Sequence, residues 1–180
     1  MDKPAVPHQI RKVFEGRVFS VVVESITTPK GGKMDVEIVR HPGSVVLIPL
    51  TADGEVILVR QYRHAIGRSA WELPAGTLKP NEEPTKAAAR ECHEEIGLLP
   101  TGLEELGSYF PTPGYCDEEM IFYKATGLRE AGPGDEAAQQ DEDEDIQQQA
   151  FSLEQIRSMI RSGDIIDMKT VAGVALLGRV

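Results

Sequence analysis

The sequence predicts an α+β fold, or a helix/sheet/helix layered arrangement, for a chain of 180 residues. Short runs of alternating apolar and polar residues fill the first third of the chain, as is typical of antiparallel strands. The apolar spacing then changes to that of a helix, and two further helical stretches close the chain. Elements mixed in this order pack as layers around one core, and 41% apolar residues suffice for that core.

Four strands are expected in the first third of the chain. The turn-forming residues 29–33 separate the first two strands. Asp53-Gly54, between two apolar runs, is a strong signal for a hairpin that joins the next two. The expected strands are residues 12–23, 34–39, 44–50 and 55–62.

A helix is expected over residues 83–96. Pro84 suits its first turn, and Gly97 suits its C-terminal end. Ala88, Ala89, Cys92 and Ile96 recur at helical spacing and should face the core. The elements expected after it are strands at 103–110 and 119–125, joined by a turn-rich loop at 111–118, and helices at 152–161 and 168–177.

The charge is strongly negative, with 19 basic and 29 acidic residues and a net charge of −10. Seven of the acids lie between residues 135 and 145, so much of the charge is local. Such a surface repels phosphates, which argues against nucleic acid and anionic membranes as partners. Two cysteines, no long apolar run and a start without a signal-peptide core lead us to expect a cytoplasmic protein.

Three glutamates on the central helix are candidate ligands for a metal ion. Glu91, Glu94 and Glu95 share one helix face and repel one another, and one neighbouring arginine cannot neutralise them. Mg²⁺ binds readily through two carboxylates together with water and substrate phosphates. The sequence therefore indicates a magnesium site, with a solvated acidic helix face as the alternative.

The spacing around these glutamates resembles the signature box of the Nudix hydrolases. Gly76 is followed six residues later by Glu82, and then by Arg-Glu-Cys-His-Glu-Glu-Ile-Gly-Leu at 90–98. Only Cys92 departs from the pattern, where an aliphatic residue is usual, and a buried cysteine packs as a small hydrophobe. The resemblance implies an α/β/α layered fold, with a mixed β-sheet sandwiched by helices and an N-terminal antiparallel β extension.

The resemblance also implies roles for the residues of the box. Glu91 and Glu95 match the main metal ligands, and the carbonyl of Ala75 matches a backbone ligand. Glu94 matches a further ligand or a catalytic base. The implied cofactor is Mg²⁺, with Mn²⁺ as a possible substitute. The supporting residues are Arg90, which orients its neighbours, together with Glu82 and Gly76.

Features outside the box resemble the ADP-ribose and nucleoside diphosphate sugar pyrophosphatases within that superfamily. They are the lead-in Trp-Glu-Leu-Pro-Ala-Gly at 71–76, the Pro-x-Pro-Gly-x-x-Asp-Glu loop at 111–118, and the acidic loop. The implied reaction is metal-dependent hydrolysis of a small nucleotide sugar to a nucleoside monophosphate and a sugar phosphate. Glu142 and Glu144 match the loop glutamate that assists catalysis. Arg63, Glu118 and Phe19 are candidate substrate-binding residues.

The same resemblance predicts the organisation of the chain. Residues 1–42 form a β extension expected to pack across the two-fold axis of a homodimer, and residues 43–180 form the hydrolase domain. Three alternatives stay open. The substrate could be GDP-mannose, or a dinucleoside polyphosphate, for which Tyr115 lies at a suitable distance past the box. The chain could also be a non-catalytic module that senses a nucleotide.

Overall fold

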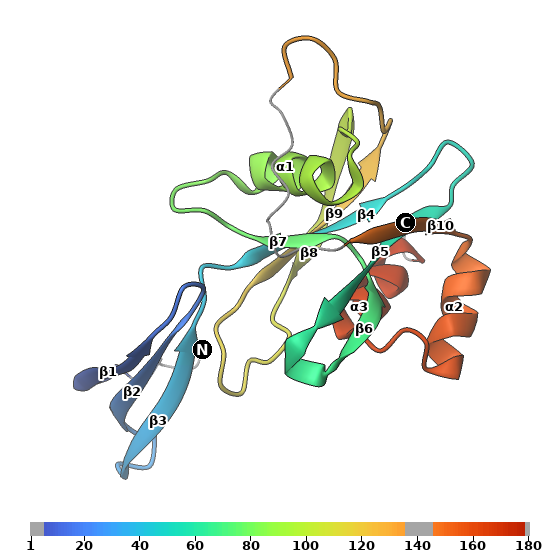
Figure 1. Ribbon diagram of the computed structural model, residues 1–180. Helices are drawn as coiled ribbons and strands as arrows, with labels where there is room; N and C mark the ends of the chain where they lie inside the picture. Colours follow the sequence, from blue (N-terminus) through green and yellow to red (C-terminus); the bar gives the residue numbers. More distant parts are fainter. Residues whose placement is uncertain (1–5, 136–145, 179–180) are drawn as a thin grey trace. The chain divides into compact units, whose positions relative to one another are not determined.

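The computed structural model describes residues 6–135 and 146–178. The chain divides into two compact units (Figure 1). The N-terminal unit contains Met1–Gly43 together with Phe110–Glu119, and the larger unit contains Ser44–Tyr109 and Met120–Val180.

The N-terminal unit is a three-stranded antiparallel sheet in the order β1-β2-β3. Its strands are β1 (Gln9–Glu15), β2 (Ser20–Thr27) and β3 (Lys33–Arg40). The loop at 110–119 joins the edge of β3 as a short parallel partner. The Val39 amide donates to the Tyr115 carbonyl at 2.8 Å, and the Asp117 amide donates to the Val39 carbonyl at 3.1 Å.

Side chains fasten the same loop to the end of β3. The Arg40 guanidinium donates to Asp117 at 2.7 Å and to Glu24 at 2.5 Å, and the His41 amide donates to Asp117 at 2.9 Å. Burial opposes ionisation of Asp117, but the bonds from Arg40 and His41 outweigh it, and the pKa of Asp117 lies below its usual value. The loop is therefore an integral part of the N-terminal sheet.

The prediction of one strand over residues 12–23 was wrong. The chain turns within this stretch, where the Gly16 amide donates to the Phe19 carbonyl at 2.9 Å. A Cβ built on Gly16 would lie 2.8 Å from the Phe14 ring and 3.0 Å from the Phe19 carbonyl oxygen, so a larger residue in this tight turn would displace the Phe14 side chain. The alternating apolar residues continue through the turn, and they concealed it.

The larger unit combines a mixed four-stranded sheet with a three-stranded antiparallel sheet. The first has the order β7-β4-β9-β8, with β4 and β9 parallel, and the second has the order β10-β5-β6. The strands are β4 (Ser44–Pro49), β5 (Val56–Arg63), β6 (Arg68–Glu72), β7 (Ala75–Thr77), β8 (Gly102–Tyr109), β9 (Met120–Thr126) and β10 (Gln147–Phe151). The helices are α1 (Pro84–Ile96), α2 (Leu153–Ser162) and α3 (Met168–Leu177).

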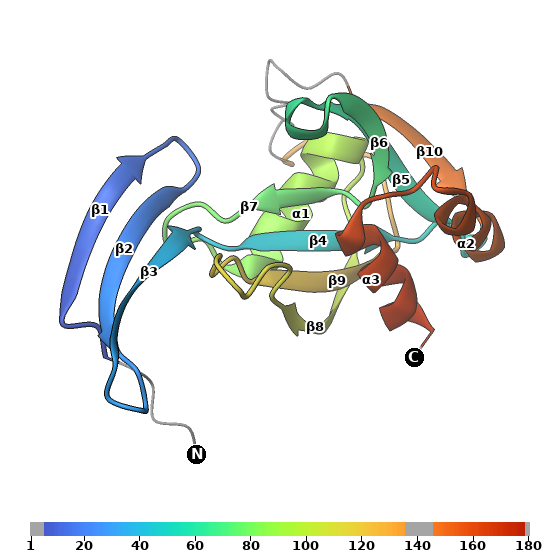
Figure 2. The same ribbon diagram turned by 90° about the horizontal axis from the view of Figure 1, so that it is seen from below.

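Strand β4 separates two halves of the core. Val45 and Leu47 pack in the cluster that contains the buried face of α1, whereas Val46 and Ile48 pack in the cluster of α2 and α3. Successive strand residues point to opposite faces, so this alternation places helices on both sides of the sheet. Figure 2 shows α1 and α3 on opposite faces of β4. The layered α+β prediction is confirmed.

Strands β6, β7 and β10 were not predicted. Strand β10 begins Gln-Gln-Gln, without apolar alternation, and forms because it pairs with the edge of β5. Strand β7 has only three residues and includes Gly76. No helix among the described residues is long and apolar enough to span a membrane.

Candidate active site

Helix α1 presents the predicted carboxylates at the sheet. Pro84 occupies its first turn, and Gly97 ends it with the left-handed φ of 70° that favours glycine. Ala88, Cys92 and Ile96 are buried against the sheet, as predicted, whereas Ala89 is only partly buried and Ala87 is buried in its place. Glu91 and Glu95 are also nearly buried, at 8% and 5% exposure, so their charges need partners.

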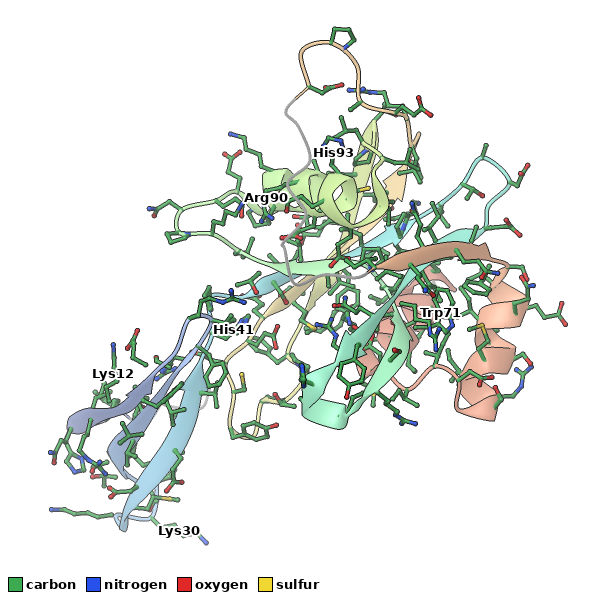
Figure 3. All side chains as sticks on the ribbon, in the orientation of Figure 1. Lys12, Lys30, His41, Trp71, Arg90 and His93 are labelled. Carbon is green, nitrogen blue, oxygen red and sulfur yellow. The ribbon has the colours of Figure 1, made fainter. Side chains whose placement is uncertain are left out.

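Arg90 connects three of the box glutamates. Its Nε and Nη2 donate to Glu82 at 2.8 and 2.9 Å, and its Nη1 donates to Glu91 at 2.5 Å and to Glu94 at 2.8 Å. The bonds to Glu82 and the charge of Glu91 raise the pKa of Arg90 above its ordinary value. Figure 3 labels Arg90 at the side of α1 near the preceding loop. Arg90 therefore contacts the glutamates that it is predicted to orient.

The backbone entering β7 lies against the other side of these carboxylates. The Ala75 amide donates to Glu95 at 3.1 Å. A Cβ built on Gly76 would overlap the Glu91 carboxylate, so the glycine of the box makes room for that side chain. Glu91 and Glu95 therefore lie beside the Ala75–Gly76 backbone.

This arrangement provides the oxygen ligands that a hard divalent cation prefers. Within residues 6–135 and 146–178, no three His, Cys, Asp or Glu side chains converge as a ready-made metal cluster. Mg²⁺ does not need such a cluster, because one or two carboxylates, water and substrate phosphates complete its coordination. The Glu91 and Glu95 carboxylates, which lie beside the Ala75–Gly76 backbone, fit that requirement.

Arg63, at the end of β5, is held by a buried glutamate. Its Nε and Nη2 donate to Glu72 at 2.9 and 2.7 Å, forming a bidentate pair. The bonds to Glu72 raise the pKa of Arg63, and the nearby charge of Glu95 adds to that effect. Arg63 is thus a fixed, half-exposed cation within the electrostatic field of the box.

Comparisons with known proteins identify the family to which this chain belongs. The NUDIX domain family matches residues 40–170, which is most of the chain. The chain belongs to the Nudix family. The Nudix box is therefore the stretch from Gly76 to Leu98.

Curated relatives match most of the chain. A methanol dehydrogenase activator from Bacillus methanolicus is 37% identical over 92% of this chain and 88% of its own length. An ADP-ribose pyrophosphatase from Bacillus subtilis is 32% identical over the same shares. Another, from Mycobacterium tuberculosis, is 34% identical over 88% of this chain and 76% of its own length.

A solved structure confirms the Nudix fold. The crystal structure of an ADP compounds hydrolase superposes with a TM-score of 0.84 at 21% identity, over 98% of this chain and 94% of that one.

The other predicted site residues fall into two groups. Phe19 and Glu118 belong to the N-terminal unit. Phe19 is 43% exposed and packs against Phe14, with ring centroids 5.8 Å apart. Glu118 lies 3.8 Å from the His41 ring. Glu142 and Glu144 lie outside the described residues.

Glu72 was predicted only as part of the lead-in motif, and no role was predicted for Lys169. Both side chains are almost completely buried, and they form an ion pair. A single lysine in a terminal helix is normally exposed, so composition and spacing gave no signal for it.

Proposed function

We propose that this Nudix protein hydrolyses the pyrophosphate bond of ADP-ribose or a related nucleoside diphosphate sugar. The products are a nucleoside monophosphate and a sugar phosphate. The observation that carries the proposal is the placement of Glu91 and Glu95 beside the Ala75–Gly76 backbone, with Arg63 held nearby. The two relatives named ADP-ribose pyrophosphatase favour this substrate class.

Each candidate site residue in the larger unit has a proposed role. Glu91, Glu95 and the Ala75 carbonyl hold Mg²⁺, or Mn²⁺ in its place, and Glu94 is a further ligand or a base. When bound there, the cation would neutralise charge on the diphosphate and lower the pKa of the attacking water. Arg90 orients the ligands through the bonds described above. Arg63 binds the diphosphate through the edge of its guanidinium that Glu72 does not use.

We also propose roles for Glu142, Glu144, Phe19 and Glu118. Glu142 or Glu144 accepts a proton from the attacking water. Phe19 stacks on the base of the nucleotide, and Glu118, in the 110–119 loop, binds the substrate. The proposed location of the protein is the cytoplasm.

We also propose a homodimer formed through the N-terminal sheet. Every residue of β1 is exposed, and the sheet exposes large apolar side chains that would normally be covered. They include Ile10, Val13, Phe14 and Met34, each at least 47% exposed. A second copy of the sheet would cover them, and sedimentation at micromolar concentration tests the assembly. A fully active monomer would contradict this part of the proposal.

The function is tested by incubating the protein with ADP-ribose, GDP-mannose and a dinucleoside polyphosphate, with Mg²⁺ and with a chelator. We expect AMP release from ADP-ribose that depends on the cation. Glu95→Gln should abolish turnover while the protein stays folded, because it removes a ligand charge. Binding of ADP-ribose without turnover by the wild-type protein would instead favour a sensing module.

A second candidate function is activation of a methanol dehydrogenase, because the relative of that name is 37% identical to this chain. The rate of a methanol dehydrogenase is measured with wild-type protein and with Glu95→Gln. Activation by the wild-type protein alone would connect the effect to hydrolysis. No change in rate with either protein would exclude this candidate.

A further inference from the structure

A chain of four charges, of which the two central ones are buried, connects α3 to Arg63. Glu72 Oε2 accepts from Arg63 Nη2 at 2.7 Å and also from Lys169 Nζ. The side chains of Glu72 and Lys169 are only 4% and 8% exposed. Lys169 Nζ also lies 3.1 Å from the Asp167 carboxylate. The four charges alternate in sign, from Arg63 at the site to Asp167 at the start of α3.

Burying the charged side chain of Lys169 costs free energy that a purely structural residue would not need to lose. A buried ion pair loses its hydration, and apolar side chains of similar volume often stabilise a core equally well. Burial also opposes ionisation of Glu72, but the bonds from Arg63 and Lys169 keep its pKa below the usual value. Glu72 therefore stays charged with two cations on one oxygen, which fixes the orientation of its carboxylate.

The same turn of α3 also fixes the backbone that follows Glu72. Thr170 Oγ1 accepts from the Leu73 amide at 2.8 Å, and it donates to Asp167 at 2.6 Å. The Pro74 carbonyl accepts from Leu47 at 2.8 Å, and the Ala75 amide donates to Glu95. Each of the four residues from Glu72 to Ala75 is thus bonded to another element. Asp167, Lys169 and Thr170 anchor the first half of this segment.

We propose that Lys169 is a positioning residue for substrate binding, acting through Glu72 on Arg63. The inference rests on the proposed function, because it takes Arg63 as the group that binds the diphosphate. Lys169 holds Glu72, and Glu72 holds the Nε and Nη2 edge of the guanidinium. A guanidinium is a rigid planar fork, so fixing one edge also fixes the other. Arg63 Nη1 has no hydrogen bond within the described residues, and the side chain is 42% exposed. That edge is left for an anion.

The test measures the affinity for ADP-ribose apart from turnover. Calorimetry with metal-free protein gives Kd, and kinetics with Mg²⁺ give KM and kcat. Lys169→Met should raise Kd and KM about tenfold or more, the scale of a lost charge-assisted bond, and change kcat less. Lys169→Gln is a second variant that retains a polar group at this buried position. Lys86→Met is the matched control, since Lys86 is 76% exposed and pairs only with Glu83 among the described residues.

A double-mutant cycle with Arg63→Gln distinguishes positioning from general damage. If Lys169 acts through Arg63, then Lys169→Met in the Arg63→Gln background should leave Kd unchanged. Full additivity of the two effects, or Lys169 variants that bind like the wild type, would overturn the inference. An Arg63→Gln variant that binds normally would instead refute the proposed role of Arg63. If Lys169→Met does not fold, the same comparison with Lys169→Gln decides.

Discussion

Arg90→Met should destabilise the metal-free protein by about 3 kcal/mol, and magnesium should recover part of the loss. Arg90 donates four hydrogen bonds to Glu82, Glu91 and Glu94, whose side chains are 11% to 17% exposed. Removing one partner of a buried ion pair costs about 3–5 kcal/mol, because the remaining charge is uncompensated. Since these carboxylates keep some contact with water, the lower end of that range applies.

The assay is thermal unfolding with chelator and with saturating magnesium. A loss of about 3 kcal/mol corresponds to a decrease in Tm of about 6–12 °C for a chain of this size. Magnesium should raise the Tm of the variant more than that of the wild type, because the cation replaces the missing positive charge. Arg129→Met is the control, since Arg129 makes a comparable bond to Asp135 at the surface. Equal melting of the two variants in chelator would refute the reasoning.

Three further perturbations test other parts of the structure. Burial, and then the charge of Glu95, raises the pKa of Cys92 to about 12, so a thiol reagent at neutral pH should modify only Cys116 until the protein is denatured. The pKa values of Glu72 and Asp117 lie below those of the unfolded chain, so their stabilisation is complete only above about pH 5 and is lost as the pH falls further. Urea midpoints at neutral and acidic pH measure that loss, and unchanged midpoints would contradict it. Gly76→Ala should reduce kcat/KM by about 10²-fold, since the added Cβ displaces the Glu91 carboxylate, while circular dichroism stays unchanged.

The features that depend on local spacing could be predicted from the sequence. Glu91 and Glu95 lie on one helix, so a period of 3.6 residues sufficed to place them together. The family and the layered fold followed from the same stretch and are confirmed. The capping glycine at 97 and the buried face of α1 were likewise readable from local patterns.

Features that depend on distant pairing could not be predicted. Lys169 is 97 residues from Glu72, and nothing in either local sequence announces the pair. Strand β10 has no strand-like alternation and exists because β5 offers an edge. The turn at Gly16 was hidden because the apolar pattern runs through it. In each case tertiary context outweighs the local signal.

The N-terminal unit is built from two separate segments of the chain, because the loop at 110–119 joins the sheet formed by the first 43 residues. Arg40 and Asp117 are 77 residues apart, so the three strands are synthesised long before the segment that completes their edge. During translation the unit must wait for the intervening strands and helix before its last backbone bonds close. A truncation that removes only the first 43 residues would leave Asp117 without Arg40. The 110–119 loop and the end of β3 therefore depend on each other for these bonds, which can close only after the intervening residues have been synthesised.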